Sequence, residues 1–123
     1  MLWDDSKRRE VTRIPHKREY DIWVSRLSQE QVQNIRAEIL RSISIKGDDI
    51  ATAGWIPGSD WTGTPFQPIY EVACRCDKTA SGKCFGLFVW TTLMEHEDYW
   101  GFGRYELNNV PIESMTYFKV TPR

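Results

Sequence analysis

The segment from Lys78 to about Asp98 constrains the fold more than any other part of this sequence. Asp77 is a favoured helix N-cap, and the residues after it predict a helix of about twenty residues. A helix that is apolar on nearly every side lies inside a core. We therefore predict three or four helices packed around this central helix. The apolar side chains of the central helix are Phe85, Leu87, Phe88, Val89, Trp90, Leu93 and Met94.

A second helix is predicted from Gln29 to Ile45. Ser28 and Gln31 have the spacing of a capping box, in which each side chain binds the other residue's backbone N–H. The apolar residues that follow recur at helical spacing and predict one buried face. They are Val32, Ile35, Ile39, Leu40 and Ile43.

Two shorter helices are predicted on either side of it in the chain. The apolar pattern of Tyr20 to Leu27 is consistent with a short helix that opens at Asp21. Thr64 can cap a further helix with Pro65 at its first position, and we expect this helix to continue to about Arg75.

The C-terminal region predicts an antiparallel β-hairpin at about residues 100–120. Apolar and polar residues alternate from Ile112 to Val120, which is the period of a β-strand. A further short strand is predicted within Ile50 to Ile56. Because a lone hairpin is marginally stable, it must pack on the helices, gain a strand or pair with another subunit. The predicted fold class is α+β.

The length of 123 residues fits a single domain, which we place at residues 20–123. Residues 1–19 carry six basic and four acidic side chains, so we expect a basic, partly flexible arm. It is either a solvated terminus, a contact for a protein or a contact for nucleic acid. The net charge of −1 gives no global field that favours nucleic acid, so we do not expect that partner. The basic residues are Lys7, Arg8, Arg9, Arg13, Lys17 and Arg18.

The stretch from Trp55 to Tyr70 holds four aromatic residues between glycines and prolines. Prolines and glycines bend the chain at set points, so the rings are held in chosen directions. They either fold back as a clasp over the long helix, line a small-ligand pocket or anchor a protein partner. The candidate ligand-binding residues are Trp55, Asp60, Trp61, Phe66, Gln67, Tyr70 and Trp100.

Catalytic and metal-binding signals are weak. His96 lies among three carboxylates and, with Asp60 and Glu71, completes the weak candidates for acid–base chemistry. Cys84 and His96 would be about 18 Å apart on one helix, too far to bind one zinc ion, so we expect no metal and no cofactor. No known nucleophile motif is present, and we lean away from an enzyme.

The remaining features concern location and partners. Three cysteines, an odd number, fit free thiols in a reducing cytoplasm, and no apolar run is long enough to cross a membrane. We therefore expect a small cytoplasmic binding or regulatory module that acts on a partner protein or forms a homodimer. The alternatives are the small-ligand site, with or without chemistry at His96, and nucleic-acid contact through the basic arm.

Overall fold

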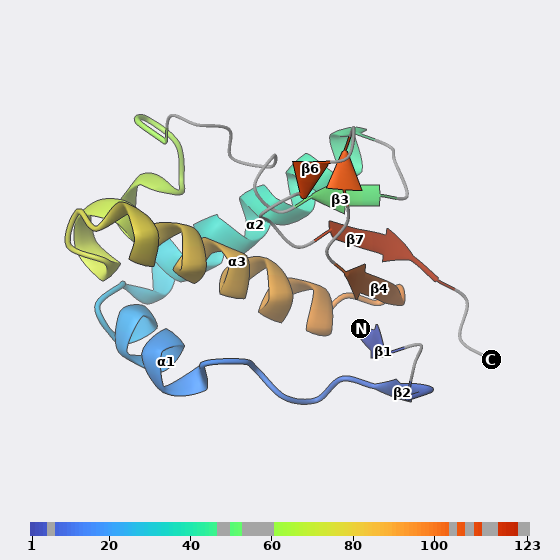
Figure 1. Cartoon of the computed structure of the whole chain (residues 1–123). Coiled ribbons are helices and arrows are strands. Elements are labelled where there is room, and N and C mark those ends of the chain that lie inside the picture. Colours follow the sequence, from blue (N-terminus) through green and yellow to red (C-terminus); the bar gives the residue numbers. More distant parts are fainter. Residues whose placement is uncertain are drawn as a thin grey trace.

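The computed structural model describes residues 1–4, 7–46, 50–52, 61–103, 106–107, 110–111 and 116–120. The fold is α+β, as the sequence predicts. Its helices are α1 (Lys17–Ser25), α2 (Gln29–Lys46), α3 (Lys78–Met94) and a wider π-helical segment, η2 (Ile69–Ala73). The strands gather at one end of the helices, next to the C-terminal end of α3 (Figure 1).

Helix α2 begins with the predicted capping box. The backbone N–H of Ser28 donates to Gln31 Oε1 at 2.9 Å, and the N–H of Gln31 donates to Ser28 Oγ at 3.1 Å. Ile35 and Ile39, which lie one turn apart, are fully buried. The helix therefore packs one apolar face inward, as its spacing indicates.

Helix α3 packs against α1, α2 and η2. The carboxylate of Asp77 accepts the N–H of Ala80 at 3.0 Å, which confirms the predicted cap. Ten of its seventeen residues are buried, and Phe88, Val89 and Leu93 have no exposed surface. The predicted end near Asp98 is wrong, because the helix stops at Met94 and the chain turns toward the strands.

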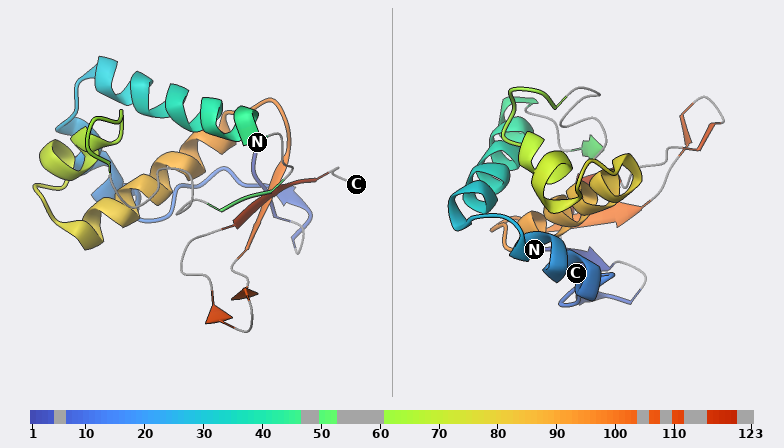
Figure 2. Two further views of the ribbon diagram at one scale, coloured as in Figure 1. Left: turned by 90° about the horizontal axis from the view of Figure 1, so that it is seen from above. Right: turned by 90° about the vertical axis from the view of Figure 1, so that its left-hand side faces the viewer.

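The main sheet has three antiparallel strands in the order β3, β7, β4. Strand β4 (Trp100–Gly103) pairs with β7 (Thr116–Lys119), which confirms the predicted hairpin, and β3 (Ile50–Thr52) adds the third strand. Between β4 and β7 in sequence, β5 (Glu106–Leu107) pairs with β6 (Val110–Pro111). This small pair projects away from the helices (Figure 2, left).

The N-terminal segment is attached to the free edge of β4. Leu2 forms a parallel bridge with Trp100, and the N–H of Trp100 donates to the carbonyl of Met1 at 2.8 Å. Leu2 is fully buried. The segment continues through β1 (Trp3–Asp4) and β2 (Arg9–Glu10), which pair antiparallel. The partial flexibility expected for residues 1–19 stays a prediction.

Two further helix predictions are wrong. Helix α1 begins at Lys17 instead of Asp21, so Lys17 and Arg18 belong to the helix. The helix expected from Pro65 to Arg75 is replaced at Ile69 by η2, where the N–H of Cys74 reaches the carbonyl of Ile69 five residues back. The segment then ends in two left-handed residues, at positions 75 and 76, which no helix accommodates.

Candidate binding surface

The described part of the aromatic stretch packs onto α3. Trp61, Phe66 and Phe85 form a three-ring cluster with centroid separations of 5.0 to 6.4 Å. Phe66 and Phe85 are each 2% exposed. These two rings therefore fill the core, as a clasp would. Trp55 and Asp60 lie outside the described residues.

Trp100 is not near this cluster. Trp61 contacts Phe85 in the first half of α3, whereas Trp100 follows the C-terminal end of the helix. From Phe85 to Met94 the helix rises by about 13 Å. Trp100 has no exposed surface, and its backbone forms the bridge with Leu2. Among the described candidates, Trp100 therefore lies apart from Trp61 and Phe66, and the small-ligand site stays a prediction.

The polar groups of the aromatic stretch bind one another. The amide of Gln67 donates to Glu71 Oε1 at 2.8 Å and accepts the backbone N–H of Gly63 at 2.9 Å. Tyr70 is half-buried and belongs to η2. The Gln67 and Glu71 side chains therefore stabilise the local turn.

His96 is held in place after the end of α3. Its Nδ1 accepts the backbone N–H of Asp98 at 3.0 Å, and the indole N–H of Trp100 lies 3.4 Å away. Since both groups are donors, Nδ1 carries no proton and the neutral ring has its proton on Nε2. The Asp98 carboxylate is 3.7 Å from the Lys119 ammonium group. The His96 ring therefore connects the turn after α3 to Trp100, the first residue of β4.

The three cysteines are free thiols with different surroundings. Cys74 and Cys84 are buried, and Cys76 is exposed. Burial raises the pKa of the Cys84 and Cys74 thiols, so both stay protonated at neutral pH. Among the residues that the structure describes, no three His, Cys, Asp or Glu side chains are placed to bind a metal ion.

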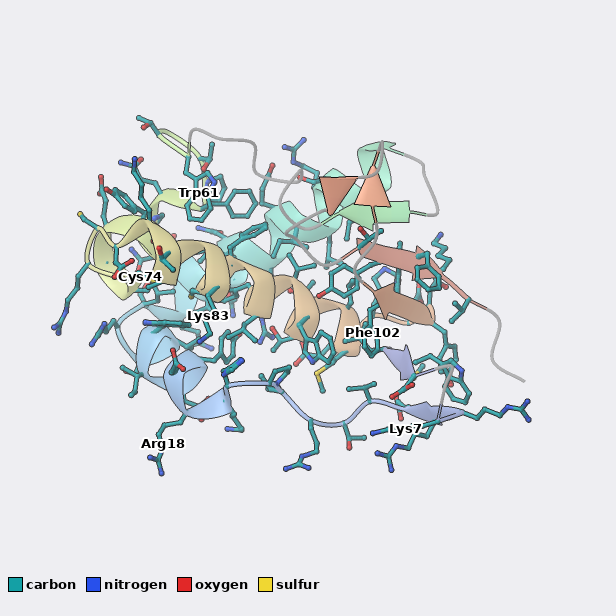
Figure 3. All side chains as sticks on the ribbon, viewed as in Figure 1. Lys7, Arg18, Trp61, Cys74, Lys83 and Phe102 are labelled. Atoms are coloured by element: carbon teal, nitrogen blue, oxygen red, sulfur yellow. The ribbon has the colours of Figure 1, made fainter. Side chains whose placement is uncertain are left out.

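The basic residues of the N-terminal segment and α1 lie on one edge of the molecule. This segment runs below α3 from α1 to β2 in Figure 1, and Figure 3 labels Lys7 and Arg18 near its two ends. Arg18 points away from the body of the protein. We define the basic edge as the five exposed cations between positions 7 and 18 that have no ion pair with a described residue: Lys7, Arg8, Arg9, Arg13 and Arg18.

The backbone beneath the basic edge is anchored to the core. The indole N–H of Trp90, in α3, donates to the carbonyl of Arg13 at 3.1 Å. Val11 and Ile14 pack against the core, and the N–H of Val11 donates to the carbonyl of Leu2 at 2.8 Å. These contacts attach the backbone at Val11, Arg13 and Ile14 to the core, between the cations of β2 and those of α1.

Two of the described carboxylates near the edge are already paired with cations outside it. Asp21 binds Lys17 at 2.7 Å, and Glu19 binds Lys83 of α3 at 3.2 Å. Asp4 lies opposite Arg9 in the β1–β2 register. Glu10 is exposed and makes no ion pair with a described residue. Among the residues that the structure describes, no carboxylate forms an ion pair with the five cations of the edge, which therefore keeps a surplus of positive charge.

One neighbouring apolar residue was not among the predicted site residues. Ile22 of α1 is 48% exposed, more than any other large apolar side chain whose surroundings the structure describes. Tyr20 and Trp23, which are buried, define the inner face of α1. At 100° per residue Ile22 lies on the opposite face, so a helical-wheel analysis of α1 would have identified it.

Comparison with protein-family models, with curated proteins and with solved structures found no match to this chain. In the described part of the chain, no helix has the length and apolar character needed to cross a membrane. The functional argument therefore rests on the basic edge and on α1.

Proposed function

We propose that this chain is a small binding module that recognises a partner protein through its basic edge. The observation that carries this proposal is the set of exposed cations that have no ion pair with a described residue, on a segment whose backbone is bonded to the core at Arg13. Four of the five are arginines, whose planar guanidinium groups bind carboxylates through two parallel hydrogen bonds. Such an edge attracts acidic groups of a partner and sets the orientation in which the partner docks.

A nucleic acid would also be attracted by cations, but two observations favour a protein. The net charge of the chain is −1, so no overall positive field attracts a phosphate backbone. Exposed Ile22 adds an apolar group, which protein interfaces use and phosphate backbones do not. The free thiols of the chain support a reducing compartment, and we place the module in the cytoplasm.

Native mass spectrometry of the protein purified gently from its own host tests the proposal. Three forms are compared: the unchanged chain, an edge variant (Arg8→Glu, Arg13→Glu and Arg18→Glu) and a control variant. The control variant (Arg41→Glu, Arg75→Glu and Lys78→Glu) changes the net charge equally, at exposed positions outside the basic edge.

We expect the unchanged chain and the control variant to retain a protein partner in fixed stoichiometry and the edge variant to lose it. If the partner is a second copy of the chain, the mass spectrum of the unchanged chain should show a homodimer, and that of the edge variant should show only the monomer. Equal retention by the edge variant, or retention of nucleic acid alone, would contradict the proposal.

A further inference from the structure

The outer face of α1 carries an arginine and an apolar side chain one helical turn apart. Arg18 and Ile22 are both exposed, and residues four apart on a helix have their Cβ atoms about 6 Å from each other. Ile22 points away from the face that packs inward through Tyr20 and Trp23. The pair therefore contributes little to the packing of α1.

Ion pairs lie on the flanks of this face. Lys17 binds Asp21, and Glu19 reaches across to Lys83 of α3. Both pairs neutralise the carboxylates of α1 without using Arg18. The outer face therefore presents the guanidinium group of Arg18, which has no ion pair with a described residue, beside the apolar side chain of Ile22. Arg13, which precedes α1 in the chain, adds a further exposed cation.

We infer that the outer face of α1 binds an acidic partner segment that also bears an apolar side chain, with a partner carboxylate on Arg18 and the apolar side chain on Ile22. This inference rests on the proposed function and specifies the chemistry of the partner. Charge complementarity selects the acidic residues. Burial of the half-exposed Ile22 side chain selects the apolar one.

The spacing of the two contacts limits the partner segment. Because the Cβ atoms of Arg18 and Ile22 are about 6 Å apart on one helix face, a single short partner segment that presents a carboxylate and an apolar side chain on the same side can contact both. Additional carboxylates in the segment would lie toward Arg13. A purely acidic segment would satisfy the arginines and leave Ile22 exposed, so it would bind less tightly.

Selection from a display library of short random peptides on the immobilised full chain tests the inference. The expected product is a set of peptides in which acidic residues flank a Leu, Ile or Phe. A selected peptide should bind Arg18→Glu about tenfold more weakly, and the loss should shrink at high salt, where charge interactions are screened.

The same peptide should bind Ile22→Gln about fivefold more weakly at every salt concentration, because this variant removes apolar contact and leaves all charges in place. Arg41→Glu on α2 serves as the charge control and should leave the affinity unchanged. Circular dichroism of each variant verifies that α1 remains folded.

The inference is wrong if selection enriches no acidic peptides, or if Ile22→Gln leaves affinity for the selected peptide unchanged. Either result can occur while the edge variant still loses its protein partner. In that case the proposed function is retained, and only the inferred chemistry of the partner is rejected. If the edge variant keeps its partner as well, both proposals fail.

Discussion

Helices α3 and α1 are packed against each other but use their side chains in opposite ways. Ten of the seventeen residues of α3 are buried, whereas only Tyr20 and Trp23 are buried in the nine-residue α1. A buried side chain is constrained by all its neighbours, and an exposed one is constrained mainly by solvent. Changes in α3 should therefore alter stability, while changes on the outer face of α1 should alter binding and leave stability intact.

The largest effect is expected at Trp90. Trp90 is 8% exposed, and its ring centroid lies 4.8 Å from that of Phe102. Its indole N–H donates a hydrogen bond to the carbonyl of Arg13. Trp90→Ala should lower the free energy of unfolding by about 3–5 kcal/mol, measured by urea denaturation. A loss below about 1 kcal/mol would show that α3 does not occupy the core position assigned to it.

The next effect is a pH dependence that originates in Cys84. Burial and the neighbouring Cys74 raise the pKa of the Cys84 thiol above its usual value. Above about pH 8.5 the unfolded chain therefore releases a proton that the folded chain keeps. The free energy of unfolding should fall as pH rises, by up to about 1.4 kcal/mol per pH unit for this thiol.

Cys84→Ala provides the comparison for that pH dependence. The variant should show a shallower decline between about pH 8.5 and 10.5, and the same pH dependence as the unchanged chain near neutrality, where the thiol is protonated in both states. Identical alkaline slopes for the two proteins would rule out Cys84 as the origin.

A smaller effect is expected where the two helices meet. Thr91 Oγ1 of α3 donates to the carbonyl of Phe88 at 3.1 Å, so the Tyr20 hydroxyl of α1 is the donor in its own 3.1 Å contact with Thr91. Tyr20→Phe keeps the ring against Phe88 and removes this buried hydrogen bond. Stability should fall by about 1 kcal/mol in the same urea experiment. A neutral result would indicate that water replaces the lost partner.

The smallest effect on stability is expected at Ile22. Because its side chain is half-exposed on the outer face, Ile22→Gln should change the free energy of unfolding by less than about 0.5 kcal/mol. The thermal midpoint of the variant measures this. A larger loss would mean that the outer face of α1 supports the fold, and the distinction between the two helices would no longer hold.

Local signals in the sequence predicted several elements correctly. The Ser28–Gln31 capping box and the Asp77 cap form as their spacing predicts, because each involves residues three apart whose geometry is set by the first turn of a helix. The β4–β7 pairing agrees with the predicted hairpin, but the expected alternation does not hold within β7, where the adjacent residues Thr116 and Tyr117 are both buried. These features depend on nearby residues and need no knowledge of the tertiary fold.

The features that the sequence did not reveal depend on distant residues. Nothing in the neighbourhood of Leu2 indicates that it forms a bridge with Trp100, and both residues are fully buried. The basic edge was predicted as a charge pattern, but which cations remain unpaired depends on partners such as Lys83, on another helix. The π-helical turn at Ile69 was also missed, because the apolar spacing of five residues does not distinguish an α-helical turn from a π-helical one.

The bridge between Leu2 and Trp100 has a consequence for the order of assembly during synthesis. A ribosome releases Leu2 long before Trp100, so the nascent chain holds an apolar N-terminal residue that has no strand to join. Helices α1 and α2, whose internal contacts are local, can form in the meantime. The β1–β2 part of the basic edge therefore takes its final position only when β4 has emerged, and a truncated chain that lacks β4 would present those cations without a fixed arrangement.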